Sequence, residues 1–268
     1  MPITPYRGFD VTIDGSSLKS YGQINAYELA VLTDLNHIYN SQTGRVLFND
    51  FRGTGRSIKI VPEEKNGTNA NARGVSAKDS LPLGEKYPDG CSWLESLSGK
   101  RGCSSPTIGS GRGSNAVIEF SPLKYNDKYP GFRPDEILIH EMVHAIRDAR
   151  GINGGNKELL AGSIFRGGKI YDNEDEFIAI LITNIYSSEQ KRPSLRMDHN
   201  GFGDLDTDTD ETFLPHRDES DYRYRLLHKL VAQDTVLALE LQKIPSKFNP
   251  IRRFFYLQSQ PRYVPLAV

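Results

Sequence analysis

The segment from Ile137 to Gly151 reads ILIHEMVHAIRDARG and contains two histidines four positions apart. Residues at this spacing lie on one face of a helix, so His140 and His144 can bind one metal ion together. Glu141 follows the first histidine, where a carboxylate can hold a water beside the metal and take its proton. Two ligands and a general base within five positions are typical of a zinc-dependent hydrolase. The alternative is a core helix whose histidines are only hydrogen-bonded.

A catalytic zinc ion usually has three protein ligands, so the chain must supply one more. The extended pattern that ends in a third histidine is excluded, because Arg147 and Arg150 occupy its glycine and histidine positions. Glu176 is the strongest candidate for the third ligand, because on a helix it shares a face with small and apolar residues that can pack against the first helix. Glu174 and Asp175 lie near the N-terminus of the same helix, where acidic residues need only stabilise the helix dipole. Glu158 and Glu189 are weaker candidates for the third ligand.

Four helices follow from periodicity and end signals. The metal-binding pattern predicts a helix over 134–151, with proline in its first turn and glycine at its end. A second helix is predicted over about 173–187, and leucines at helical spacing predict another over 25–40. A long amphipathic helix is predicted over about 221–242.

Strands are predicted at 45–50, 57–64 and 115–122, and the stretch 65–114, rich in Gly, Ser and Asn, is predicted as surface loops. The strand at 115–122 is a candidate edge strand above the metal, to which an extended substrate would pair. Its alternative is an inner strand with a covered edge. No repeat or linker is visible, so we expect one α+β domain over 1–268, with a small twisted sheet packed on the metal-binding helix.

The composition excludes several function classes. With 33 basic and 34 acidic residues the formal net charge is −1, so the positive excess of a nucleic-acid-binding protein is missing. The apolar run FIAILI at 177–182 is far too short to cross a bilayer. The first residues lack the basic start and apolar run of a cleavable signal peptide. We therefore expect no nucleic-acid partner, no membrane span and no cleavable leader.

Two further features have more than one interpretation. Cys91 and Cys103 are either two free thiols or one local disulfide, which would imply an oxidising compartment. The acidic run GDLDTDTDETF at 203–213 lacks glycine and glutamate at the spacing of a calcium-binding EF-hand loop. A solvated loop is the preferred interpretation of that run.

The segments HEMVH and NEDEFIA together resemble zinc metallopeptidases among bacterial toxins and effectors. The catalytic domain of anthrax lethal factor has a similar Asn-Glu-x-Glu-Phe-x-Ala segment that supplies its third zinc ligand, and this distant resemblance implies the same role for Glu176. The chain resembles NleD-like effector metallopeptidases more closely, a group with type III effectors and toxin domains of VgrG-type type VI secretion spikes. TNIYSSE and LRMDHNGF look like that group's segments. The resemblance covers about 115–202, the expected catalytic core, and implies a zincin-like fold.

The same resemblance implies a tyrosine that steadies the oxyanion of the attacked carbonyl. Lethal factor has this tyrosine seven positions before the glutamate ligand, where the present chain has Lys169. Tyr171, five positions before, is therefore the candidate for this catalytic role. Tyr186 is a weaker candidate whose alternative is core packing. His199 is either another hydrogen-bond donor or a residue that caps its own loop.

The sequence thus predicts a zinc-dependent metalloendopeptidase, in which His140, His144 and Glu176 hold Zn²⁺ and Glu141 is the general base. The resemblance implies a secreted effector or toxin without a cleavable signal peptide, which acts in the periplasm of a competing bacterium or in the host cytosol. Expected partners are a protein or peptide substrate and a cognate immunity protein or secretion-system component. Two alternatives stay open: a zinc amidase that cleaves peptidoglycan, and a binding module that uses zinc only structurally.

Overall fold

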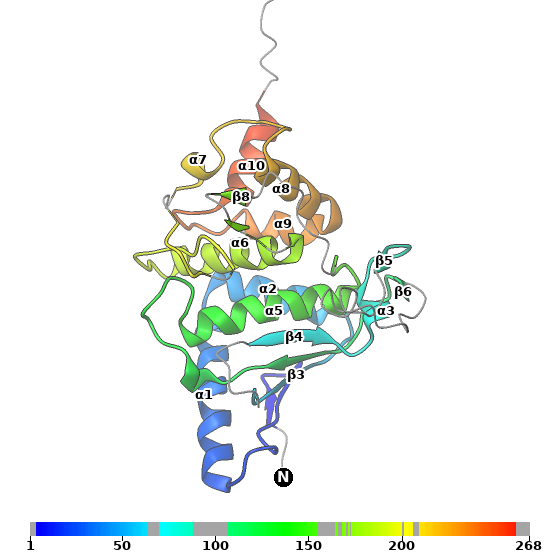
Figure 1. The fold of residues 1–268 in the computed structure, drawn as a ribbon, viewed down its shortest axis with the longest axis vertical. Helices are drawn as coiled ribbons and strands as arrows, with labels where there is room; N and C mark the ends of the chain where they lie inside the picture. Colours follow the sequence, from blue (N-terminus) through cyan, green and yellow to red (C-terminus); the bar gives the residue numbers. More distant parts are fainter. Residues whose placement is uncertain are drawn as a thin grey trace, which may run out of the picture.

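The computed structural model describes residues 4–63, 70–87, 107–154, 164–165, 168–169, 171, 173–199, 201–205 and 209–260. These parts form a five-stranded sheet, two short two-stranded sheets and helices stacked beyond the large sheet (Figure 1). The expected α+β class with a small sheet is confirmed.

The five-stranded sheet has the order β1-β2-β3-β7-β4. Its three inner strands run parallel, and each edge strand runs antiparallel to its neighbour. Alternate residues of β3 and β7 are buried, as expected for strands that face a core on one side. The strands are β1 (Thr4–Tyr6), β2 (Phe9–Ile13), β3 (Ile58–Val61), β4 (Asn71–Gly74) and β7 (Ala116–Glu119).

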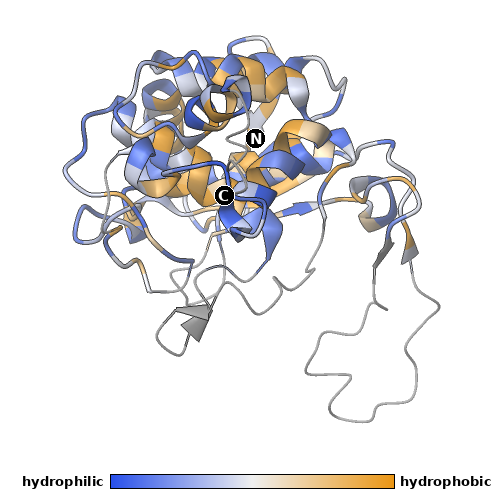
Figure 2. Cartoon of the chain, turned by 90° about the horizontal axis from the view of Figure 1, so that it is seen from above, coloured by the Kyte–Doolittle hydropathy of each residue, from blue (hydrophilic) through white to orange (hydrophobic). Residues whose placement is uncertain are grey.

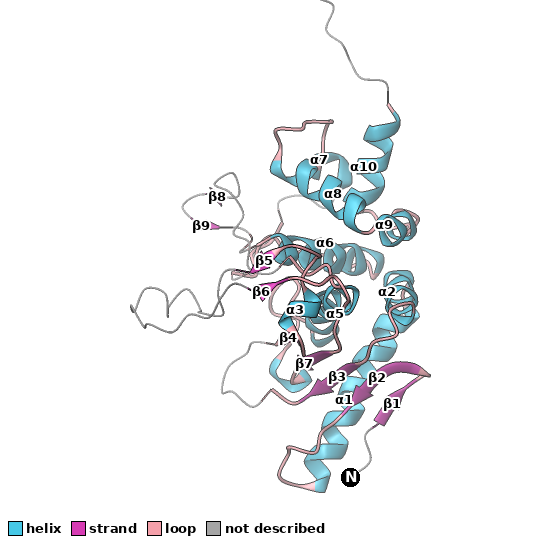
Figure 3. Ribbon diagram, turned by 90° about the vertical axis from the view of Figure 1, so that its right-hand side faces the viewer, coloured by secondary structure: helices cyan, strands magenta, loops and turns pink. Residues whose placement is uncertain are grey.

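The helices lie in layers on this sheet. Figures 1 and 3 show α5 next to the sheet, α6 on the other side of α5, and the C-terminal helices beyond α6. The long helices are α1 (Tyr21–Asn40), α2 (Gln42–Arg52), α5 (Pro134–Arg150), α6 (Glu174–Glu189), α8 (Tyr222–Gln233), α9 (Thr235–Leu241) and α10 (Pro250–Ser259). The short elements are α3 (Ala77–Ser80), β5 (Lys86–Tyr87), β6 (Thr107–Ile108), η1 (Pro122–Lys124), β8 (Ile164–Phe165), β9 (Gly168–Lys169) and α7 (Asp210–Phe213).

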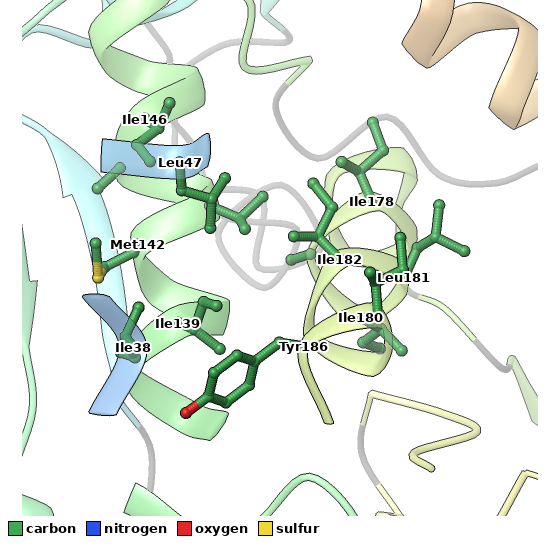
Figure 4. Close-up of a cluster of buried hydrophobic side chains, with 14 of the residues drawn as sticks. Ile38, Leu47, Ile139, Met142, Ile146, Ile178, Ile180, Leu181, Ile182 and Tyr186 are labelled. Atoms are coloured by element: carbon green, nitrogen blue, oxygen red, sulfur yellow. The ribbon is translucent and has the colours of Figure 1, made fainter. Parts of the chain in front are cut away.

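Helix α5 is the centre of the molecule, because it is covered on all sides. Every residue from Asp135 to Ala149 is buried. Figure 4 shows Ile139 and Met142 of α5 near Ile38 of α1, with the apolar side chains of α6 opposite. Burial of such a side chain stabilises the fold by roughly 1.5–3 kcal/mol. Most helices carry both apolar and polar residues in Figure 2, as expected when one side faces this core.

The prediction of a strand at 45–50 is wrong, because this segment belongs to helix α2. Ser41 caps the helix by accepting a hydrogen bond from the Gly44 N–H at 2.8 Å. Leu47, Phe48 and Phe51 are buried, which is helical spacing. The six-residue window was too short to reveal this period.

The helix predicted over 221–242 is interrupted at Asp234, which separates α8 from α9. Asp234 adopts non-helical angles, and its carboxylate accepts a hydrogen bond from the Leu237 N–H at 3.2 Å. Its other oxygen lies 3.1 Å from Nε of Arg150 on α5. Apolar residues keep helical spacing through both helices, so the pattern alone cannot show the break.

The segment 65–114 is not wholly loop, because it contains β4, α3, β5 and β6. The pairing of β4 with β7 also corrects the expected edge strand: β7 is an inner strand, and β4 forms the edge. Cys91, Cys103, Glu158 and part of the acidic run lie outside the described residues. Among the described helices, none is long and apolar enough to cross a membrane.

A buried carboxyl in the core gives a stability prediction. Burial, with the nearby Asp135 charge, raises the pKa of Asp34 on α1 to about 7. Because this value lies above the unfolded one, the stability contributed by Asp34 is present below about pH 4 and is lost as the pH rises through about 7. Asp34→Asn should therefore stabilise the protein by about 2–3 kcal/mol more at pH 8 than at pH 5.

Urea unfolding of both proteins at the two pH values measures this difference. Asp10→Asn, which removes an exposed carboxyl on β2, is the matched control. An equal effect of Asp34→Asn at both pH values would contradict the prediction.

Candidate metal centre

Helix α5 begins and ends at defined signals, which fix where its histidines point. Pro134 occupies the first helical position, and the Glu136 carboxylate accepts a hydrogen bond from the Arg133 N–H at 3.1 Å. Gly151 ends the helix at φ 68°, and a Cβ there would lie 2.6 Å from the Gly111 backbone. Only glycine fits this end of the helix.

The donor atoms of the three predicted ligands, His140, His144 and Glu176, lie close together. Nε2 of His140 lies 3.2 Å from Nε2 of His144 and 3.1 Å from Oε2 of Glu176. The distance from Nε2 of His144 to the same Glu176 oxygen is 3.4 Å. The three donor atoms therefore form a nearly equilateral triangle, with its corners supplied by α5 and α6.

This triangle fits a zinc ion. Tetrahedral ligand atoms at 2.0–2.2 Å from zinc are roughly 3.3–3.6 Å apart, close to the distances between these atoms. Two imidazole nitrogens and one carboxylate oxygen are also a common donor set of catalytic zinc. The histidines are buried, and buried ligating groups need a cation or hydrogen bonds to offset their loss of hydration.

The first turn of α6 contains three acids, and each has a different partner. Glu176 lies at the third helical position, where its N–H donates to Oδ1 of the cap residue Asn173 at 2.9 Å. Asp175 forms a buried ion pair with Arg147 of α5. Glu174 pairs with Lys229 of α8. The two ion pairs hold the turn so that Glu176 faces the histidines.

Arg147 links α5 to several elements. Besides Asp175, its guanidinium donates to the Ile152 carbonyl at 3.0 Å and to Oε1 of Gln233 on α8 at 3.3 Å. Arg147, which occupies the glycine position of the excluded three-histidine pattern, therefore anchors α6, the helix that carries Glu176.

The charges of the ligand candidates strongly influence one another's pKa values. Burial opposes ionisation of Glu176, but the charge of His144 and hydrogen bonds from both histidines outweigh it and keep its pKa well below the usual range. Burial also opposes a charge on His144, but Glu176 raises the His144 pKa to about 9. Burial lowers the pKa of His140 to about 3. Without a metal, Glu176 and His144 thus form an ion pair beside a neutral His140.

Glu141 lies next to this triangle on the side of β4. Burial raises its pKa to about 7, although His144 acts in the opposite direction. The N–H of Ala72 on β4 is close enough to the carboxyl to lower its pKa. A carboxyl with a pKa near neutrality is suited to both accept and donate a proton.

Other predicted residues are placed elsewhere. The Tyr171 ring packs edge to face on Phe177, with centroids 5.1 Å apart. Among the described residues no hydrogen bond joins it to the ligand candidates, so its catalytic role stays a prediction. The Tyr186 hydroxyl donates to Asp135 in the first turn of α5 at 2.5 Å, which is a packing role. Glu189 accepts hydrogen bonds from the first turn of α2, and this accounts for its carboxylate.

His199 also lies at the site, although the spacing of the ligands along the sequence does not indicate this. Its Nε2 lies 3.3 Å from Oε2 of Glu176. One ligand atom each from His140, Glu176 and His199 lie within 4.8 Å of one another. The long interval between the second histidine and position 199 carries no recognisable metal spacing, so only the fold brings this residue to the triangle.

A match to a known family is consistent with this donor set. Residues 14–218 match the family Peptidase M91, described as "Effector protein". The chain belongs to this family, which confirms the resemblance to effector metallopeptidases. The match extends well beyond the expected core at 115–202 and includes most of the N-terminal part.

The chain was also compared with solved structures and with curated proteins. The chain is similar to the light chain of Clostridium botulinum neurotoxin serotype F, at 12% identity and a TM-score of 0.38. The alignment covers 96% of this chain and 62% of that chain, so the present chain spans about three fifths of the light chain. No curated protein matches the chain.

The two ion pairs of the α6 first turn should differ in energetic value. Arg147 and Asp175 are each 3% exposed, whereas the Glu174–Lys229 pair is partly exposed. Asp175→Asn would leave the guanidinium buried without its counter-charge, which we expect to cost about 3–5 kcal/mol of unfolding free energy. Glu174→Gln, the matched control one position earlier, should cost about 0–1 kcal/mol.

Denaturant unfolding of the two variants and the wild type measures this difference. Equal losses in both variants would show that Asp175 does not anchor α6 to α5.

Proposed function

We propose that this chain is a zinc-dependent endopeptidase that acts as a secreted bacterial effector. The observation that supports it most is the triangle of His140, His144 and Glu176 donor atoms, with the Glu141 carboxyl beside it. In this proposal His140, His144 and Glu176 hold Zn²⁺, and Glu141 is the catalytic base.

When bound, zinc lowers the pKa of a water to about 7 and polarises the carbonyl to be attacked. Glu141 would accept the proton of the attacking water as the water oxygen bonds to the carbonyl carbon. The same carboxyl then donates the proton to the amide nitrogen as the C–N bond breaks. One water is consumed, and the products are a carboxylate and an amine.

The peptide substrate would bind along β4. Among the described strands, β4 pairs on one side only, with β7. The Val75 N–H donates to the Asn115 carbonyl, so alternation along the strand turns the N–H of Ala72 away from β7. An extended peptide that pairs at Ala72 would lie beside Glu141. This edge replaces the one expected at 115–122.

Family membership supports secretion and action in a target cell, and the effector class supports a protein substrate. We extend this to delivery by type III or type VI secretion, with toxicity in the periplasm of a competing bacterium or in host cytosol. A cognate immunity protein or secretion component is the partner that such delivery requires. The extension depends on the resemblance of segments 183–189 and 195–202 to effector metallopeptidases.

The two alternatives predict different products. An amidase directed at peptidoglycan would release cell-wall fragments and create no new protein N-termini. A purely structural zinc centre closes its fourth position with a protein ligand and has no use for a buried carboxyl beside the ligands. The placement of Glu141 favours catalysis over the structural alternative.

The proposal predicts that Glu141→Ala keeps its metal and loses its chemistry. Wild type, Glu141→Ala and the exposed-site control Glu240→Ala are purified, and zinc per chain is measured. All three should hold one zinc. Each is then added to a bacterial periplasmic extract and to a eukaryotic cytosolic extract, and new protein N-termini are identified by labelling and mass spectrometry.

Wild type and Glu240→Ala should create the same new N-termini, and Glu141→Ala should create at least 100-fold fewer. The extract in which cleavage occurs identifies the class of target cell. Absence of zinc from the wild type would refute the proposal at its base. Release of muropeptides from purified peptidoglycan, with no new N-termini, would support the amidase.

A further inference from the structure

We propose that His199 is an additional catalytic residue, whose Nε2–H donates a hydrogen bond to the substrate carbonyl oxygen as that oxygen gains negative charge. This inference rests on the proposed function and adds a role that the metal ligands and Glu141 leave open. Such a donor is needed because the attacked carbonyl carries most of the charge that develops in the transition state.

The position of His199 supports this role. Its side chain is 30% exposed, whereas those of His140, His144 and Glu176 are 4%, 11% and 15% exposed. His199 therefore lies on the open side of the triangle, where a substrate would arrive. Its ring is nearly parallel to that of His140, with centroids 6.0 Å apart.

The contact between His199 and Glu176 favours a hydrogen on Nε2 of the histidine. An ionised carboxylate can only accept, and Oε2 of Glu176 lies 3.3 Å from Nε2 of His199. A hydrogen on Nε2 of His199 suits this contact, and the same atom faces the centre of the triangle.

The loop that carries His199 is built to hold it. Arg196 is buried, and its guanidinium donates to the carbonyl oxygens of Asp198, at 2.7 Å, and of His199. The backbone of Arg196 exchanges two hydrogen bonds with the Asn184 side chain on α6, at 2.7 and 2.9 Å. The ring of Phe202 packs on this guanidinium, whose Cζ lies 4.0 Å from the ring centroid. Arg196 is therefore a positioning residue that fixes the His199 backbone to the same helix as Glu176.

The test uses a probe that does not depend on the natural substrate. A phosphinic Ala-Ala dipeptide analogue presents two oxygens that share one negative charge in place of the attacked carbonyl, and such analogues bind through transition-state contacts. Its Kd is measured with the zinc protein by calorimetry for wild type, His199→Ala, His199→Gln and the exposed control His216→Ala. The zinc Kd of each variant is measured by chelator competition, and folding by thermal unfolding.

We expect His199→Ala to weaken the phosphinate by at least 10-fold while its zinc Kd stays within about 3-fold of the wild-type value. The Gln side chain retains a donor, so His199→Gln should recover part of the affinity, and His216→Ala should match the wild type. Once a cleaved protein is known, His199→Ala should lower kcat by about 10²–10³-fold with little change in KM.

Two results would overturn this inference and leave the proposed function intact. Phosphinate affinity equal to the wild type in His199→Ala would show that His199 does not contact the oxygen. A loss of zinc affinity of 10-fold or more would show that it ligates the metal or orients Glu176 instead. Wild type that binds no zinc, or binds zinc and no phosphinate, would refute the proposed function itself.

Discussion

The whole site depends on how helix α6 is held against helix α5. Three of the site's four polar groups, His140, Glu141 and His144, come from consecutive turns of α5, and their relative positions follow from helix geometry alone. Glu176 comes from a separate helix, and its place depends on the buried Arg147–Asp175 pair and on the Asn173 cap. A shift of α6 by one residue would remove Glu176 from the histidines and would also leave two buried charges unpaired. The same contact therefore fixes the fold and the site.

The second constraint is the charge buried around the triangle. Glu141 and Glu176 bring two carboxyls into a space with three histidines and little solvent. In the metal-free protein this arrangement is balanced by a proton on His144, because Glu176 raises the pKa of that histidine. A divalent cation would satisfy the same groups at their present separations without a large movement. The site is thus prepared for metal by the rigid packing of α5 between the sheet and α6.

The sequence was informative where chemistry and local geometry coincide. The helix bounds at Pro134 and Gly151, the pairing of His140 with His144, and the approach of Glu176 all follow from short patterns. It was misleading where tertiary contacts decide. Residues 45–50 are apolar enough for a strand, yet Ser41 and Glu189 cap them as a helix. The break at Asp234 is stabilised by Arg150 of a distant helix, and β4 acquires its place only by pairing with β7.

The role of His199 could not be derived from spacing, because it lies 55 positions after His144, with one whole helix between them. Its position results from Arg196 and Asn184, whose contacts are not visible as a motif. For Tyr171 the resemblance suggested a catalytic role; its ring packs on Phe177, and the catalytic role stays a prediction.

The central claim is that His140, His144 and Glu176 hold one zinc ion. A crystal of the zinc-loaded protein, with anomalous diffraction recorded on both sides of the zinc absorption edge, tests it most directly. The account predicts one strong peak at about 2.0–2.2 Å from Nε2 of both histidines and from Oε2 of Glu176. A peak at any other group of ligands, or no peak at the triangle in zinc-saturated crystals, would contradict it.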